Sequence, residues 1–201
     1  MIVHELESIV RRINPAALFP QRPGSIEVEL GSGDGSFLIE YARAHPEKNF
    51  LGIERLLGRV QKTARKSARA GLDNVRLIRL EAGYFLEWML PLESIDTLHV
   101  YFPDPWPKRK HRKYRLINER FPALADRVLL DRGCLHLRTD HADYFEQMTQ
   151  VMREAPCFEP IAPPLDLTRW VTDFEAGFMA QGLPIYRASY RKLKLQNQTA
   201  A

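Results

Sequence analysis

Residues 25–44 read SIEVELGSGDGSFLIEYARA, and this stretch decides the expected fold. A short strand is predicted at Ser25–Leu30, a tight turn with three glycines at 31–35, and a helix directly after it. Gly31 and Gly33 can take positive φ angles and let a ligand approach the backbone closely. Strand, glycine-rich turn and helix in this order form the first unit of a doubly wound, nucleotide-binding α/β fold.

The remainder of the chain alternates strand and helix patterns in the same way. Six more strands are predicted at 49–53, 75–80, 94–102, 133–138, 157–162 and 184–193. Helices are predicted at 4–13, 56–70, 84–90, 115–131 and 141–154. This order predicts an α/β fold with a mostly parallel, Rossmann-like seven-stranded sheet whose last two strands form an antiparallel pair. No linker divides the chain, so we expect one domain over 1–201, with a lead-in at 1–24 and a frayed tail at 194–201.

Composition indicates a globular protein with one sizeable core. The chain has 201 residues, a hydrophobic fraction of 45%, a net charge of +4 and two cysteines without metal-ligand spacing. No apolar run approaches the ~20 residues of a transmembrane helix, and the first residues lack the apolar core of a signal peptide. We therefore expect a cytoplasmic protein that uses neither a metal nor a membrane. The sequence leaves monomer and homodimer open.

Acidic residues stand where the predicted parallel strands end: Glu29, Glu54, Glu81, Asp104 and Asp140. Ligands of such sheets bind outside the carboxyl ends of the strands, so these side chains should converge on one rim. Several acids there suit a cationic ligand with hydroxyl groups and suit a pyrophosphate poorly. S-adenosylmethionine, with its sulfonium, amine and ribose, therefore fits better than NAD. Glu54 is the expected ribose ligand, because it lies about 20 residues beyond the glycines; the alternative is an exposed charge at a strand end.

A proline-rich loop with a dense basic run follows the fourth predicted strand. Residues 101–115 read YFPDPWPKRKHRKYR. Three alternate prolines stiffen a non-helical loop that presents Asp104 and Trp106. Six of the eight residues at 108–115 are Lys or Arg, which favours contact with phosphates. Trp106 either stacks on a base or packs in the core. A second basic stripe at 59–69 is interpreted as a solvated face, with RNA contact left open.

Five motifs occur in order along the chain: VELGSGDGSF, the Glu81-Ala82 pair, FPDPWPKRKHRKYR, the RTD of 138–140 and the TDFE of 172–175. With them the sequence resembles the bacterial tRNA (guanine-N7-)-methyltransferases, a family of class I methyltransferases. The resemblance extends from about residue 25 to residue 191. The PDPW-P-K-x-x-H block is its most specific part, because the glycine turn alone would indicate only a class I methyltransferase.

The resemblance implies a role for individual residues. Glu29, Glu54, Glu81 and Asp104 match contacts to S-adenosylmethionine, and Asp104 also matches the residue central to the reaction. The family usually has Asp where this chain has Glu81, one methylene longer. The positions that match tRNA contacts are Lys108, Asp140, Thr172, Asp173, Phe174 and Glu175. The implied target is a guanine in the variable loop of tRNA.

The implied chemistry agrees with the residue types. Guanine N7 has a free lone pair, so its methylation needs no strong base, and positioning can supply most of the catalysis. Asp104 would stabilise the positive charge that develops on the purine. Asp140 and Glu175 would accept protons from the guanine edge, and Trp106 or Phe174 would stack on the base.

Three alternatives remain at this point. The first is a class I methyltransferase that acts on a protein or a small molecule, which the basic run disfavours. The second is an RNA-binding protein without a donor site, which the glycine turn and the strand-end acids disfavour. The third is a dehydrogenase, which lacks support because the glycine spacing is G-x-G-x-G rather than G-x-G-x-x-G.

Overall fold

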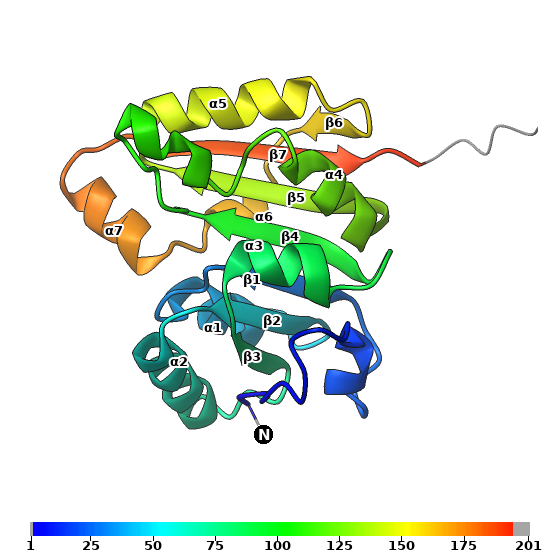
Figure 1. Ribbon diagram of the computed structural model, residues 1–201. Helices are drawn as coiled ribbons and strands as arrows, with labels where there is room; N and C mark the ends of the chain where they lie inside the picture. Colours follow the sequence, from blue (N-terminus) through cyan, green and yellow to red (C-terminus); the bar gives the residue numbers. More distant parts are fainter. Residues whose placement is uncertain (1, 195–201) are drawn as a thin grey trace, which may run out of the picture.

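The computed structural model describes residues 2–194, which form a single seven-stranded sheet covered by helices (Figure 1). The strand order is β3-β2-β1-β4-β5-β7-β6. The pairs among β1 to β5 are parallel, whereas β7 runs antiparallel to both β5 and β6. This topology confirms the predicted α/β fold with a late antiparallel pair. Strand order reverses beside β1, which places the glycine turn at the position where such sheets bind ligands.

The strands are β1 (Ile26–Leu30), β2 (Asn49–Glu54), β3 (Val75–Arg79), β4 (Ile95–Tyr101), β5 (Leu129–Thr139), β6 (Phe158–Ile161) and β7 (Tyr186–Lys192). The α-helices are α1 (Ser36–Ala44), α2 (Leu57–Arg69), α3 (Ala82–Tyr84), α4 (Phe121–Val128), α5 (Ala142–Arg153), α6 (Leu165–Thr168) and α7 (Asp173–Ala180). Two 3₁₀ segments, η1 (Pro15–Leu18) and η3 (Arg109–Tyr114), and one π-helical turn, η2 (Phe85–Met89), complete the described elements.

The core has two parts, one on each face of the sheet. Phe37 and Leu38 of α1 pack with Val60 of α2 on one face. The other face is covered by η2, α4 and α5, with Phe121 and Tyr144 among the buried side chains. Strands β1 and β2 are buried along their whole length, as expected for parallel strands covered on both faces. No helix within residues 2–194 is long and apolar enough to cross a bilayer.

Two helix predictions were wrong. Residues 4–13 form no helix; instead the lead-in runs beside the edge strand β3, where Leu77 N donates to Ile2 O and His4 N donates to Leu77 O, both at 2.8 Å. The free main-chain groups of an edge strand offer these bonds, while an isolated helix of this length is marginal in water. The helix predicted at 115–131 is only the eight-residue α4. Pro122 stands in its first turn, where its missing N–H costs nothing, rather than in its interior.

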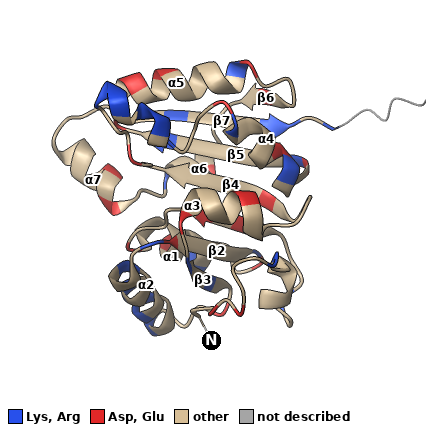
Figure 2. Cartoon of the chain, viewed as in Figure 1, with Lys and Arg blue, Asp and Glu red and all other residues tan. Residues whose placement is uncertain are grey.

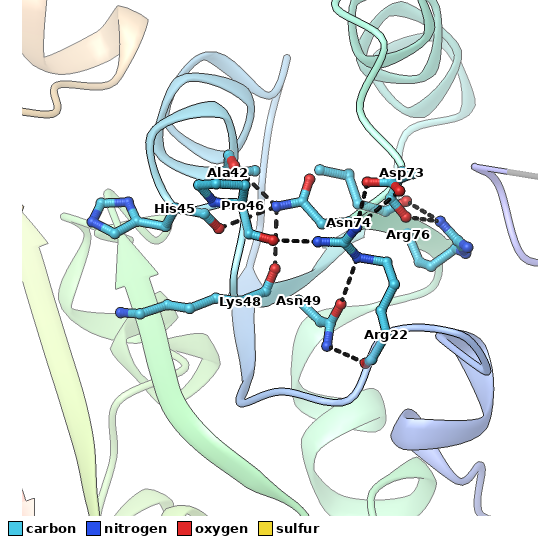
Figure 3. Close-up of polar contacts among 10 residues, drawn as sticks. Arg22, Ala42, His45, Pro46, Lys48, Asn49, Asp73, Asn74 and Arg76 are labelled. Atoms are coloured by element: carbon cyan, nitrogen blue, oxygen red, sulfur yellow. Dashed lines mark hydrogen bonds and ion pairs between the residues drawn. The ribbon is translucent and has the colours of Figure 1, made fainter.

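The amino edge of β2 and β3 is closed by side chains that bond to the main chain (Figure 3). Asn74 is buried, and its amide donates to the carbonyls of Ala42, His45 and Lys48 at 2.9–3.3 Å. Arg22 donates to both carboxylate oxygens of Asp73 at 2.8 Å. These polar groups satisfy one another, so the amino edge holds the fold together and the carboxyl edge remains for a ligand.

Candidate active site

The glycine turn after β1 is a backbone cradle with open space on one side. The N–H groups of Gly31 and Ser32 both donate to Ile53 O, at 2.8 and 2.9 Å, which ties the turn to β2. Gly31 and Gly33 have φ angles of 78° and 56°, and a Cβ added to Gly31 would meet nothing within 4 Å. A Cβ at Gly35 would instead lie 2.3 Å from Thr63 Cγ2. The third glycine therefore serves packing, and the first two leave room for a ligand.

Glu29 is a buried carboxylate beside this turn that lacks a full set of partners. Its side chain is 3% exposed, and Oε2 has no hydrogen-bond partner within the described residues. Burial raises the pKa of Glu29 to about 8, although the positive charge of Arg138 opposes the shift. A buried polar atom without a partner carries a free-energy cost that a bound cation would remove. Glu29 is therefore the clearest sign of a ligand site in the described chain.

Glu54 connects the end of β2 to the glycine turn. Oε2 accepts a hydrogen bond from Gly33 N at 3.1 Å, and Oε1 accepts one from Leu56 N at 2.7 Å. The side chain is 7% exposed, so Glu54 is not the exposed strand-end charge of the alternative interpretation. A carboxylate has about four lone-pair positions. Glu54 can thus hold the turn in place and still accept bonds from ligand hydroxyls.

Glu81 caps the helix that follows β3. Its two carboxylate oxygens accept from Gly83 N at 2.9 Å and Tyr84 N at 2.6 Å, so it acts as the N-cap of α3. The side chain is exposed at the same carboxyl edge as Glu54. Any ligand contact of Glu81 would share oxygens that already bond to the helix.

Asp104 lies exposed in a strained loop after β4. The non-glycine residues Phe102 and Trp106 have φ angles of 50° and 41°, which cost free energy and often mark functional sites. Arg115 Nε donates to Pro105 O at 2.7 Å, and this hydrogen bond fixes the main chain of the loop next to Asp104. Trp106 is half-buried against Tyr114, with ring centroids 5.4 Å apart, and so packs within the loop rather than in the sheet core. The loop thus presents Asp104 to solvent.

The basic run offers fewer cations than the sequence predicted. Arg115 is 1% exposed and bonds to Asp143 Oδ2 and Gln147 Oε1. Arg112 pairs with Asp143 at 2.7 Å. The run also forms the 3₁₀ segment η3, contrary to the predicted non-helical loop. Within this run, the exposed cations without a carboxylate partner among residues 2–194 are Lys108, Arg109, Lys110 and Lys113. In Figure 2, blue segments that mark Lys and Arg lie on α2 and at the left of the picture, the side toward which the arrow of β4 points.

The TDFE segment docks against the glycine turn through the first turn of α7. Thr172 Oγ1 accepts from Glu175 N at 2.9 Å as the N-cap of α7, and Asp173 N donates to Ser36 Oγ at 2.8 Å. The neighbouring Asp34 carboxylate raises the pKa of Asp173. Phe174 is 50% exposed, with the Arg59 guanidinium 5.8 Å from its ring centroid. The segment thus lies at the same rim as the backbone cradle of the glycine turn.

Glu175 does not present an oxygen to solvent. It is fully buried, and its carboxylate pairs with Arg138 at 2.7 Å and with Arg187. Arg138 also donates to the carbonyls of Leu167 and Trp170, at 2.7 and 2.6 Å. This arrangement differs from the expected proton acceptor for a guanine edge, because two guanidinium groups occupy the carboxylate. Glu175 instead anchors α7 to β5 and β7.

The sequence interpretation missed Arg115 and Arg138 as organising residues. Both are buried and donate to main-chain carbonyls. Arg115 bonds to Pro105 O in the Asp104 loop, and Arg138 bonds to Trp170 O in the segment before α7. The burial of Arg138 could have been predicted from the sequence, because a charged residue within an apolar strand needs a partner of opposite charge. Asp140, directly after β5, is half-buried at the same edge of the sheet.

Comparison with known proteins identifies the family. Residues 23–188 match the sequence family described as "Putative methyltransferase". The tRNA (guanine-N(7)-)-methyltransferase of Nitrosococcus oceani is 36% identical over 181 residues, covering 90% of this chain and 76% of that protein. The chain belongs to the tRNA (guanine-N(7)-)-methyltransferase family.

Further members give the same assignment. The family member from Syntrophotalea carbinolica is 34% identical over 92% of this chain and 82% of its own length. The member from Chromohalobacter salexigens is 42% identical over 74% of this chain, an alignment that spans 60% of that protein.

Solved structures agree with this fold at low sequence identity. A 30S ribosomal A1408 methyltransferase from an uncultured bacterium matches with a TM-score of 0.62 at 17% identity, over 89% of this chain and 91% of that one. The 16S rRNA methyltransferase KamB matches with the same TM-score at 14% identity, over 89% and 92%. This family member therefore has the class I methyltransferase fold.

Proposed function

We propose that this protein transfers a methyl group from S-adenosylmethionine to N7 of a guanine in the variable loop of tRNA. The observation that carries the proposal is the unpartnered Oε2 of Glu29 beside the open space over Gly31 and Gly33. A carboxylate without a partner, next to a backbone cradle, fits the amine and sulfonium of the donor. Asp104 and the exposed cations of η3 follow β4, the strand paired directly to β1.

The chain's residues divide the binding of the donor between them. Glu29 would neutralise its positive charge, Glu54 would accept from the ribose hydroxyls, and Glu81 would lie toward the adenine. When bound, S-adenosylmethionine supplies an electrophilic methyl group on a sulfonium. The glycine turn, which is fixed to β2 by two hydrogen bonds, holds these contacts in place. Such preorganisation can supply most of the catalysis by positioning.

Asp104 has the catalytic role in this proposal. Methylation at N7 leaves a positive charge on the purine, and a carboxylate held in a rigid loop stabilises that charge as it develops. Asp140 would accept a proton from the guanine edge, and Phe174 would stack on the base. Lys108 and its neighbours would hold phosphates beside the pocket. A tRNA substrate would also place the reaction in the cytoplasm.

The test is incubation of unmodified tRNA with donor labelled on the methyl group, followed by mapping of the modified nucleotide. Label at guanine N7 in the variable loop is expected. Label at another atom, or transfer only to protein or small acceptors, would show that the protein catalyses a different methyl-transfer reaction. Donor binding without any transfer would favour a binding protein.

Donor binding should release about one proton from Glu29 near pH 7. Its pKa of about 8 keeps the carboxyl group protonated at that pH. A bound cation favours the ionised form and lowers this pKa, so the proton leaves on binding. As the pH rises above 8 the group is already ionised, and the release should fade. Titration calorimetry in buffers of different ionisation enthalpy measures the proton count, and Glu29→Gln provides the matched control for protons of the donor itself. Equal counts in both proteins would exclude this role of Glu29.

The affinity for tRNA should fall as the salt concentration rises. Its salt dependence should reflect four cations: Lys108, which precedes η3, and Arg109, Lys110 and Lys113 within it. Four neutralised phosphates give a log–log slope of roughly −3 to −4. Lys108→Ala should reduce the slope by about 1, with donor affinity unchanged. Arg43→Ala, an exposed cation at the end of α1 near the amino edge, is the matched control. A filter-binding series over several salt concentrations measures both slopes, and a slope near zero for the wild type would remove the run from the RNA interface.

A further inference from the structure

A cavity of about 360 Å³ lies between η2 and the segment that connects η3 to α4. The residues that line it include Glu87 and Trp88 of η2 and Lys113 and Tyr114 of η3. Arg120, the residue directly before α4, also lines it. The volume is at the lower end of the range for small-molecule sites. The cavity shares Glu81 with the strand-end acids but includes neither the glycine turn, Glu29 nor Glu54. It is therefore adjacent to the donor cradle and separate from it.

Trp88 is exposed and does not contribute to the core of the fold. Phe85, Leu86 and Met89, the other large apolar side chains of η2, are fully buried, whereas Trp88 is 54% exposed. The turn is π-helical, a rare geometry that is frequently found at functional sites. A large aromatic side chain in solvent costs free energy unless it has a partner. Tyr114, on the other side of the cavity, is 56% exposed.

The charges around the cavity match a nucleotide. Lys113 has no carboxylate partner among residues 2–194, and its Nζ lies 5.2 Å from the Tyr114 ring centroid. Arg120 pairs with Glu87 and is 71% exposed, so its guanidinium remains accessible. Aromatic faces bind unstacked bases by stacking, and adjacent cations bind the phosphates. Lys113 also belongs to the basic run, so the cavity continues the surface assigned to tRNA.

We propose that this cavity binds an unstacked nucleobase of the tRNA, distinct from the guanine that is methylated. The proposal rests on the proposed function, because it takes tRNA as the substrate. Trp88 provides the stacking face, Tyr114 lines the other side of the cavity, and Lys113 and Arg120 hold the neighbouring phosphates. This second anchor would fix the orientation of the tRNA relative to Asp104.

The experiment compares Trp88→Ala and Trp88→Phe in the full chain. Unmodified tRNA binding is measured by filter binding over a salt series, and donor binding by calorimetry. Trp88→Ala should weaken tRNA binding by roughly tenfold or more, the range for loss of one base–aromatic stack. Trp88→Phe should restore most of the affinity. The salt slope should stay unchanged in both, because stacking releases no counterions, whereas Lys113→Ala should lower it.

Leu92→Ala provides the matched control, because Leu92 is 62% exposed just beyond η2 and does not line the cavity. Its tRNA affinity should equal that of the wild type. Unchanged tRNA affinity in Trp88→Ala would overturn the proposal. Weaker donor binding in Trp88→Ala would overturn it too, since the cavity would then belong to the donor's adenine. If the wild type itself fails to methylate tRNA, the proposed function fails first, independently of Trp88.

Discussion

Replacing Asp104 with Ala is expected to lower the rate of methyl transfer to tRNA by roughly two to three orders of magnitude, the effect of removing one preorganised electrostatic group. Asp104 is the exposed carboxylate of a loop that two positive-φ residues and the buried Arg115 hold in shape. The charge is fixed before the substrate arrives, so it needs no reorganisation as the purine becomes positive. Single-turnover kinetics at saturating donor and tRNA measures the chemical step directly.

The Asp104→Asn variant separates the effect of the negative charge of Asp104 from the effect of its side-chain size. The amide keeps the size of the side chain and its hydrogen-bonding capacity but loses the negative charge, so most of the rate loss should remain. Thermal stability of both variants should match the wild type, since Asp104 is exposed and makes no ion pair among the described residues. Near-normal turnover in Asp104→Ala would mean that the carboxylate only shapes the loop.

Replacing Glu175 with Ala is expected to destabilise the fold by roughly 3–5 kcal/mol, the usual cost of leaving a buried charge without its partner. Arg138 is 3% exposed and would lose its only carboxylate among residues 2–194, as would Arg187. For a chain of this length the loss corresponds to a fall in Tm of roughly 6–20 °C. Urea unfolding and thermal melting of the free protein measure it without any substrate.

The matched control is Glu159→Ala, which removes an exposed carboxylate 4.0 Å from Arg191. Exposed pairs contribute about 0–1 kcal/mol, so its Tm should change little. Glu175→Gln should lie between the two, because its single amide oxygen can still accept from one guanidinium group while the amide NH2 cannot accept from the other. The opposite pattern, an unchanged Tm with weaker tRNA binding in Glu175→Ala, would place Glu175 against the substrate and contradict the anchoring role.

Local sequence was sufficient to predict the glycine turn and the acids beside it. The strand–turn–helix pattern at 25–44 placed Gly31 and Gly33 beside open space, and Glu29 and Glu54 came together because parallel strands end at one edge. The same reasoning failed for residues 4–13, which form no helix; at His4 the chain bonds instead to the free edge of β3. The amphipathic spacing was real, but a short helix gains less than the main-chain bonds that the edge strand offers.

The sequence by itself determined the order of the seven strands, the glycine turn and the set of acids at the carboxyl edge, because these depend on local periodicity and on the rule that parallel strands end together. Only the tertiary structure decided which charged residues are buried. Arg115 and Glu175 look like exposed charges in their motifs, yet both pair with residues more than ten positions away. Burial of a charge depends on partners that packing brings from elsewhere in the chain, and no local pattern records them.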